Sequence, residues 1–478
     1  MVKPMPQHDA CDVADAQRRL PRRARNRQFL RPLLRTTGLF AAKGIEFANA
    51  KTWKLSLCAA AAYRKATRRS QKVVVITGSV GKTTATRATM TVLGRSAPRW
   101  VHAGDNCFAC LGRNLVRQGM RKPWVALEVG IGRAGQMKRY AAALQPDVVV
   151  ITAVTSDHIE RPRTSWTPVE KRAWLPFLRL DCGEPILSFE ALWEEKATMV
   201  RALPREGLAI LNGDDDAVMR MATETCARSL TFGMSPRCDY SARDIVLLPD
   251  ETRFTLVAEG VAMPVVAKLV GRESIRGLLA AAAVGRAAGL DFTTIVKRLE
   301  QVSPTPARMQ PIKLLCGAIA ICDDFKAGGE TVQAALNNLA DIQARRRVVV
   351  LGRLFTPHPP VGEKYAAVGR IVAACADRVV LVGWRAQLYR RGFATLRPGV
   401  PVQSAASIDD AVALLQEGLG PGDVLLIKAA GGQKLSRIAL RLAGDPVDCP
   451  LTHCKLDNTV CQECPHARAT SPVLERQS

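Results

Sequence analysis

The sequence has 478 residues, 47% of them hydrophobic, and its 68 Lys and Arg against 43 Asp and Glu give a net charge of +25. This length suggests about three domains, and the apolar fraction excludes a chain that is disordered throughout. The most apolar run, residues 278–290, is too short for a membrane helix and contains Arg286. The chain starts with acidic residues where a secretory signal would be apolar. We therefore expect a cytoplasmic protein whose 14 cysteines are reduced thiols.

Residues 1–71 are predicted to be a basic, mostly helical segment. Residues 1–72 hold 17 Lys and Arg but only four acids. Their net charge of about +13 is half of the net charge of the whole chain, +25. Such a density attracts polyanions or acidic lipid headgroups. A solvated basic arm and an amphipathic helix on the inner membrane surface both fit this pattern. Aromatic side chains are too few for base stacking, so no nucleic-acid partner is expected.

Strand-like apolar runs and helical stretches alternate in the predicted central domain, residues 72–304. The runs are VVVIT (73–77), WVALEVG (124–130) and DVVVITAV (147–154). This alternation predicts a parallel sheet with helices on both faces. Residues 205–270 contain short alternating runs and are predicted to be more antiparallel, and residues 274–290 to form a buried helix.

The alternation restarts after a proline-rich linker at residues 303–311. AIAICDD, RRVVVLG, DRVVLVG and DVLLIKA are four further strand-like runs, and one intervening helix starts near Glu363. They predict a second, smaller α/β domain over residues 305–446, of the Rossmann-like type. The remaining residues, 447–478, form a cysteine-rich tail.

A phosphate-binding loop is the strongest motif. ITGSVGKTTATRATM (76–90) follows a strand and precedes a helix. Two glycines let backbone N–H groups converge on an anion, a lysine supplies positive charge near the phosphates, and threonine hydroxyls suit Mg²⁺. The expected ATP-binding residues in this loop are Gly78, Ser79, Gly81, Lys82, Thr83 and Thr84.

This short loop resembles that of the Mur ligase family, the ATP-dependent amide ligases of peptidoglycan precursor assembly. Further segments similar to family motifs follow in the same order: ALEVGIGRAGQM, PDVVVITAV with SDHIE, SFEALWEEKATMVRALPREGLAILNGDDD, PARMQP, CDDFKAG and GDVLLIKAAGGQKL. The resemblance covers residues 72–445. It is nearest to the branch that adds D-alanyl-D-alanine to a UDP-N-acetylmuramoyl-tripeptide, without that branch's usual N-terminal domain.

The resemblance implies that a carboxylate is activated by ATP as an acyl phosphate and then joined to the amine of an amino acid or peptide. It assigns Lys82, Glu128, His158 and Lys196 to catalysis, with Lys196 carbamylated. Thr83, Glu128 and His158 become candidate Mg²⁺ ligands. Arg308 and either Asp323 or Asp324 are implied to contact the nucleotide when the domains close.

Each of these residues also has a purely structural interpretation. Glu128 could be a solvated carboxylate at a strand end, His158 a loop residue and Arg308 a linker charge. Lys196 lies in a helical EEK pattern that suits surface ion pairing. Lys171 is a rival for the carbamate, on its distance from His158 in the sequence.

The chain departs from the family pattern at positions that face the substrates. Ala153 replaces an asparagine of the strand before His158, and Glu273 and Ser274 stand where the family has His and Asn. We therefore favour an amide ligase for a different acid and amine, with the muropeptide reaction as the narrower alternative. A non-catalytic nucleotide-binding scaffold, held at a membrane or polyanion by the basic arm, and a kinase-like phosphotransferase are the other hypotheses.

The tail contains Cys449, Cys454, Cys461 and Cys464 within 16 residues. Four thiolates can enclose one Zn²⁺ or hold an iron–sulfur cluster. We expect a structural metal there, with free thiols or a redox pair as the alternative.

Overall fold

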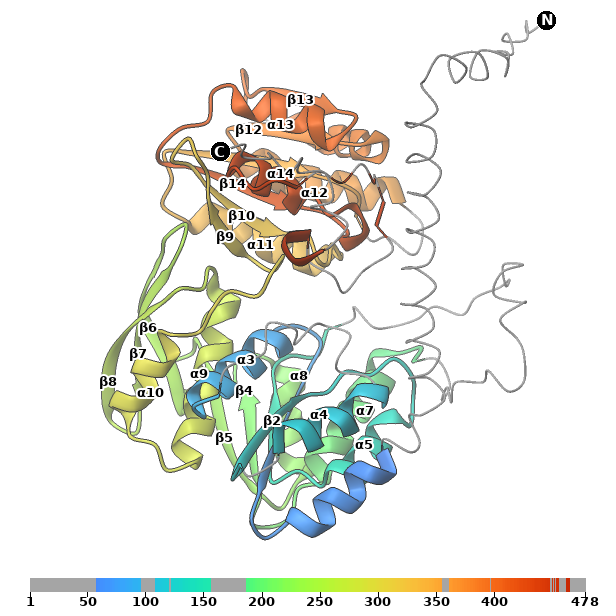
Figure 1. Cartoon of the computed structure of the whole chain (residues 1–478), viewed down its shortest axis with the longest axis vertical. Coiled ribbons are helices and arrows are strands. Elements are labelled where there is room, and N and C mark those ends of the chain that lie inside the picture. Colours follow the sequence, from blue (N-terminus) through green and yellow to red (C-terminus); the bar gives the residue numbers. More distant parts are fainter. Residues whose placement is uncertain are drawn as a thin grey trace, which may run out of the picture.

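A computed structural model describes residues 57–95, 108–119, 122–155, 186–354, 361–395, 397–447, 449, 451, 453–454 and 461–464. This part of the chain contains two β-sheets, each with its own helices. The two resulting α/β units lie one above the other in Figure 1. The N-terminal arm before residue 57, His158, Lys171 and part of the cysteine-rich tail lie outside the described residues. No helix within the described residues has both the length and the apolar character needed to cross a bilayer.

The first sheet has eight strands in the order β2-β1-β3-β4-β5-β6-β7-β8, parallel up to β6 and antiparallel beyond it. The strands are β1 (Lys72–Thr77), β2 (Trp124–Glu128), β3 (Val148–Ile151), β4 (Leu208–Asn212), β5 (Arg228–Gly233), β6 (Tyr240–Leu247), β7 (Thr252–Ala258) and β8 (Val261–Ala267). The prediction for residues 205–270 was thus right for β6 to β8 but wrong for β4 and β5, which pair in parallel.

Apolar cores cover both faces of this sheet. Successive side chains of a strand point to opposite faces. Accordingly, Val74 and Ile76 of β1 belong to one core and Val73 and Val75 to the other. This explains why the strand is continuously hydrophobic.

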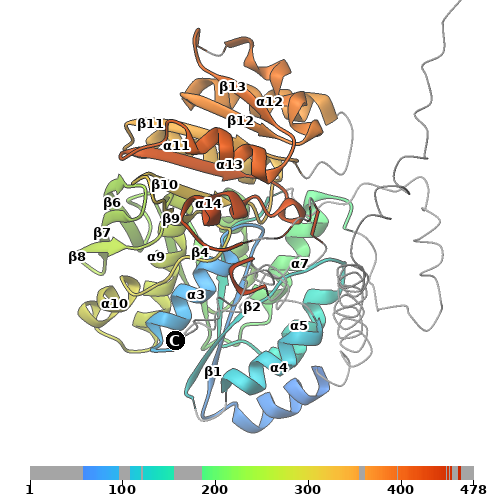
Figure 2. The ribbon, with the colours of Figure 1, turned by 45° about the horizontal axis from the view of Figure 1, so that its top comes forward.

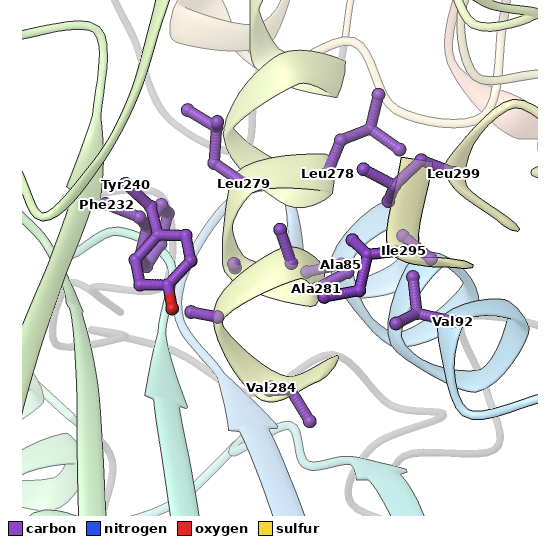
Figure 3. Close-up of a cluster of buried hydrophobic side chains, with 14 of the residues drawn as sticks. Ala85, Val92, Phe232, Tyr240, Leu278, Leu279, Ala281, Val284, Ile295 and Leu299 are labelled. Atoms are coloured by element: carbon purple, nitrogen blue, oxygen red, sulfur yellow. The ribbon is translucent and has the colours of Figure 1, made fainter. Parts of the chain in front are cut away.

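Helices supply the rest of both cores. Their bounds are α3 (Lys82–Val92), α4 (Phe108–Gly119), α5 (Gln136–Leu144), α7 (Phe189–Arg201), α8 (Asp216–Met219), η4 (Arg220–Glu224), α9 (Arg272–Ala287) and α10 (Phe292–Leu299). Figure 3 shows α3, α9 and α10 meeting through Ala85 and Val92, Leu278 and Ala281, and Ile295. The predicted buried helix is α9.

The second sheet has six strands in the order β13-β12-β11-β14-β10-β9, parallel except for β9. The strands are β9 (Gln310–Lys313), β10 (Ile319–Asp323), β11 (Arg346–Leu351), β12 (Arg378–Val382), β13 (Val402–Ala405) and β14 (Asp423–Lys428). The helices are α11 (Gly329–Asp341), α12 (Val361–Cys375), η5 (Trp384–Thr395), α13 (Ile408–Gln416), η6 (Gly431–Gln433), α14 (Ser436–Leu442) and η7 (Cys461–Glu463). The predicted α/β class holds for both sheets.

The unit built on the second sheet adjoins the unit built on the first sheet (Figure 2). The two units contact each other where α11 meets the start of α9. Leu247 and Val270, from the first unit, belong to the apolar core of the second unit. The Asn338 side chain on α11 donates to Glu273 Oε2 at 2.6 Å and accepts from the Arg272 backbone N–H at 3.0 Å. These contacts bring the loops at the carboxyl ends of β1, β2 and β10 around one space.

A buried ion pair anchors the helix at residues 57–67 to the first sheet. Arg64 is 1% exposed, lies 2.5 Å from Asp147, and also donates to the carbonyls of Gln71, Leu144 and Gln145. We expect Arg64→Leu to lower the free energy of unfolding by about 3 kcal/mol, because it leaves buried acceptors without a donor. The matched control is Lys72→Met. This lysine reaches the same Asp147 at 3.1 Å but is 54% exposed, so its loss should cost about 1 kcal/mol or less in urea unfolding.

Candidate active site

The phosphate loop connects β1 to α3 and is held by the end of β3. Gly78 and Gly81 have φ values of +146° and +84°, which favour glycine. The Thr152 hydroxyl donates to the carbonyls of Val80 at 2.6 Å and Thr77 at 3.2 Å, and the Ser79 N–H donates to the Ala153 carbonyl at 2.7 Å. The loop therefore has a fixed shape with the N-terminus of α3 at its end, the arrangement that binds phosphate groups.

Replacing Gly78 should disrupt this loop. A Cβ built at Gly78 comes 2.1 Å from Thr152 Oγ1. We expect Gly78→Ala to lower the free energy of unfolding by about 1–3 kcal/mol and to weaken nucleotide binding. Gly289→Ala is the control: its φ is +81°, and no heavy atom of the described chain lies within 4 Å of the added Cβ. Urea unfolding measures both variants. An equal loss of unfolding free energy in the two would show that positive-φ backbone strain alone, and not the clash with Thr152, destabilises Gly78→Ala.

Lys82 is buried at the first position of α3. Its Nζ donates to the carbonyls of Gly78 at 2.5 Å and Ser79 at 3.1 Å, so its charge lies over the loop. Thr83 follows it and is 3% exposed. Glu128 ends β2 beside Ile76 of β1 and is 7% exposed. The strand end therefore brings a carboxylate to the loop.

A cavity of about 530 Å³ opens from the loop toward the second unit. It is lined by Lys82, Thr83, Glu128, Lys196, Arg308 and Asp323, among others. The structure thus brings together the central predicted residues that it describes. Asp324 is different: its buried carboxylate accepts from the Ser436 N–H at 2.7 Å, so of the two alternatives Asp323 is the one that lines the cavity.

Lys196 is 1% exposed on α7, which excludes the surface ion pairing suggested by its EEK context. Burial, and next the charges of Lys82 and Lys326, lower the pKa of Lys196 well below its usual value. A lowered pKa favours the neutral form of the amine, which is the nucleophilic form, and the two nearby cations favour a negative group at this position.

This pKa shift predicts a pH effect on stability. Between the lowered pKa of folded Lys196 and the usual value of about 10.4, the unfolded chain binds more protons at this residue, so its contribution to stability rises with pH. Lys196→Met lacks this contribution. We expect the variant to be more stable than the wild type at pH 7, with a gap that narrows toward pH 9 in bicarbonate-free urea titrations. A gap that widens with pH would contradict the assigned direction.

Arg308 reaches the cavity from the linker between the units. Its guanidinium lies 4.4 Å from the centroid of the Phe325 ring. Burial lowers the pKa of Arg308, while the charges of Glu128 and Asp323 oppose that shift. Asp323 itself is fixed by Lys428, whose Nζ lies 2.6 Å from its carboxylate. The loop, Glu128 and Arg308 therefore come from three segments that are distant in sequence.

Lys326, Lys428 and Asn338 line the cavity but were given no role in the sequence analysis, and Glu273 was noted there only as a departure from the family pattern. Lys326 and Lys428 add positive charge, and Asn338 and Glu273 form the wall beside α9 and α11. Lys428 could have been singled out from the sequence, because it is a charged residue at the end of an apolar strand. Asn338 had none, because an asparagine within a helix carries no distinctive pattern.

The structure does not support the predicted metal in the cysteine-rich tail. Among the described residues, no group of three or more His, Cys, Asp or Glu side chains is arranged to hold a metal ion. Cys449, Cys461 and Cys464 instead pack against Leu440 and Val447. Burial raises the pKa of the Cys461 thiol to about 12.

Comparison with known proteins matches both units to one family. The profile described as the Mur ligase middle domain covers residues 76–165 and 184–285, and that described as the Mur ligase, glutamate ligase domain covers residues 307–431. The chain belongs to the Mur ligase family. Members of this family are ATP-dependent amide-forming ligases.

Two curated relatives illustrate the similarity. The UDP-N-acetylmuramoyl-tripeptide–D-alanyl-D-alanine ligase of Escherichia coli K12 is 24% identical over 323 residues, covering 65% of this chain and 64% of that protein. The enzyme of the same name from Mycobacterium bovis is 27% identical over 399 residues, 78% of this chain and 73% of that protein.

Solved structures agree in fold. MurF from Acinetobacter baumannii has a TM-score of 0.64 at 21% identity, over 82% of this chain and 81% of that one. MurF from Thermotoga maritima in complex with ADP has a TM-score of 0.63 at 18% identity, over 81% of this Mur ligase and 83% of that chain.

Proposed function

We propose that this Mur ligase uses the cavity between its two units to join a carboxylate to an amine at the expense of ATP. The supporting observation is that the phosphate loop, Glu128, Lys196, Arg308 and Asp323 line one cavity. An amine cannot displace oxide from a carboxylate, so the acid must first be activated. The reaction therefore requires two anions, carboxylate and triphosphate, to be held side by side.

The positive side chains of the cavity meet this requirement. Lys82, Lys326 and Arg308 reduce the repulsion between the anions as a carboxylate oxygen attacks the γ-phosphorus and ADP leaves. The amine nitrogen then attacks the acyl carbon and phosphate departs, while the amine loses a proton to water. Enclosure by both units limits hydrolysis of the acyl phosphate.

The Thr83 hydroxyl and the Glu128 carboxylate are hard oxygen donors of the kind that suits Mg²⁺, and both are buried residues that line the cavity. When bound, Mg²⁺ would neutralise phosphate charge. His158 remains a candidate ligand that lies outside the described residues.

We propose further that Lys196 is carbamylated. Its neutral amine would attack CO₂, forming a C–N bond and releasing one proton, and the product is an oxygen anion. The supporting observations are its burial and the nearby charges of Lys82 and Lys326. The carbamate would convert a residue that repels cations into one that attracts them.

Cell-wall precursors are the first substrates to test, because the relatives named above are ligases of UDP-N-acetylmuramoyl-tripeptide. We infer that the reaction takes place in the cytoplasm, where ATP is available. Contact of residues 1–72 with a membrane surface remains a prediction.

The test is a screen for phosphate release from ATP, with product mass measured. It would pair UDP-N-acetylmuramoyl-tripeptide and other carboxylates with D-alanyl-D-alanine, amino acids and other peptides. We expect release that requires both substrates and a product heavier by the amine minus water. Phosphate transferred to a stable product, or no turnover with any pair, would contradict an amide ligase.

A further inference from the structure

A second cavity, of about 410 Å³, lies on the side of α3 that faces the end of α10. Arg87, Thr91 and Arg95 line it from α3 and the turn that follows. Their spacing of four residues places them on one side of the helix. Arg298 and residues 301–303 form the opposite wall.

This cavity is separate from the active-site cavity. None of its described lining residues lines the first cavity. Lys82 begins α3, whereas Arg87 lies five residues further along, a rise of about 7.5 Å and a turn of about 140° around the helix, and Arg95 follows the helix end. An anion here would therefore not be part of the nucleotide bound at the loop.

Three guanidinium groups give the cavity its character. Arg298 donates to the Val92 carbonyl at 2.6 Å, and Arg95 donates to the carbonyls of Trp124, at 3.2 Å, and Gln118. These carbonyls orient the arginines but do not cancel their charge. The described lining includes no Asp or Glu. The described lining therefore concentrates positive charge in a fixed geometry.

Arg87 provides a second, independent observation. It is only 6% exposed although it lines the cavity, and burial lowers its pKa, which means that the surroundings disfavour its charge. An anion in the cavity would offset that cost. Guanidinium groups bind phosphate oxygens through paired N–H groups, which distinguishes them from lysine.

We propose that this cavity is a binding site for a small phosphoryl anion, such as pyrophosphate or a phosphate ester, bound between α3 and α10. Because residues 301–303 form one wall, the bound anion would also hold the segment that leads to Arg308. The site does not depend on the proposed ligase reaction.

Pyrophosphate is the probe, and titration calorimetry is the measurement. The experiment uses Lys82→Ala protein, so that binding at the phosphate loop is weakened. We expect Arg298→Gln in this background to weaken pyrophosphate binding about tenfold or more, the effect of losing one charged hydrogen bond. Arg253→Gln is the matched control: Arg253 is 58% exposed, pairs with Glu251 at 2.6 Å, and should leave binding unchanged.

A second variant tests the proposal independently of whether Arg298→Gln folds. Ser303 is an exposed residue at the cavity, so Ser303→Glu adds a carboxylate there without disturbing a core, and it should weaken binding similarly. Equal binding by the Arg298, Ser303 and Arg253 variants would overturn the proposal. Malonate serves as a dicarboxylate probe, and binding as tight as that of pyrophosphate would overturn the phosphoryl assignment.

Discussion

Lys82→Ala should reduce amine-dependent phosphate release by about 10²- to 10³-fold, because it removes a preorganised charge from the group that transfers phosphate. The Lys82 Nζ lies 2.5 Å from the Gly78 carbonyl, and this hydrogen bond holds its charge over the loop. The fold should survive, since the apolar cores on both faces of β1 do not depend on this side chain. Initial rates with saturating ATP would measure the effect.

Lys313→Ala is the control for the loss of one positive charge. Lys313 is 81% exposed and pairs with Asp250 at 3.5 Å. Its variant should keep wild-type turnover and far-ultraviolet circular dichroism. Turnover of Lys82→Ala within about twofold of wild type would refute the assignment of the loop, since charge stabilisation at a phosphoryl group is worth far more.

Lys196→Ala should be nearly as damaging, with a loss of about 10²-fold or more if a group acting on the reacting atoms is removed. Its distinguishing property is chemical rescue. The substitution removes a long side chain from a buried position beside Lys82 and Lys326, so a short carboxylate such as acetate can supply the missing anion. We expect acetate to restore part of the activity of Lys196→Ala and to leave the wild type unaffected.

The wild-type enzyme should in turn depend on dissolved CO₂. Removing bicarbonate should lower its activity, and adding bicarbonate should restore it, whereas Lys196→Ala should not respond. Activity of Lys196→Ala equal to wild type, or wild-type activity that is indifferent to bicarbonate with no rescue by acetate, would contradict a carbamate. Lys65→Ala is a control on an exposed lysine.

Strands could be predicted from the sequence where their pattern of apolar residues reflects how they are buried in the fold. β1, β10, β11, β12 and β14 are apolar runs because both faces of their sheets are covered. β9 and β13 escaped prediction because they are edge strands of four residues, and β9 contains Pro311. β4 and β5 are parallel because the chain between them, which contains α8 and η4, returns to the same end of the sheet. No local sequence pattern indicates this return.

The same distinction applies to the site. The phosphate loop is local, so its spacing alone predicts its chemistry. The burial of Lys196 depends on how α7 packs on the sheet, and its EEK context favoured the opposite. Arg308, Asn338 and Lys428 reach the cavity only because two units meet. Residues at such an interface carry no spacing signal relative to the loop they face.

The bridge made by Asn338 has a consequence for turnover. Its amide group joins the start of α9 to α11, and Leu247 and Val270 are inserted in the core of the opposite unit. Separation of the units must break both hydrogen bonds and expose the Leu247 and Val270 side chains to water. Product escape by that route therefore has an energetic barrier of its own, and weakening the bridge would speed release while leaving the bond-forming step with poorer shielding from water.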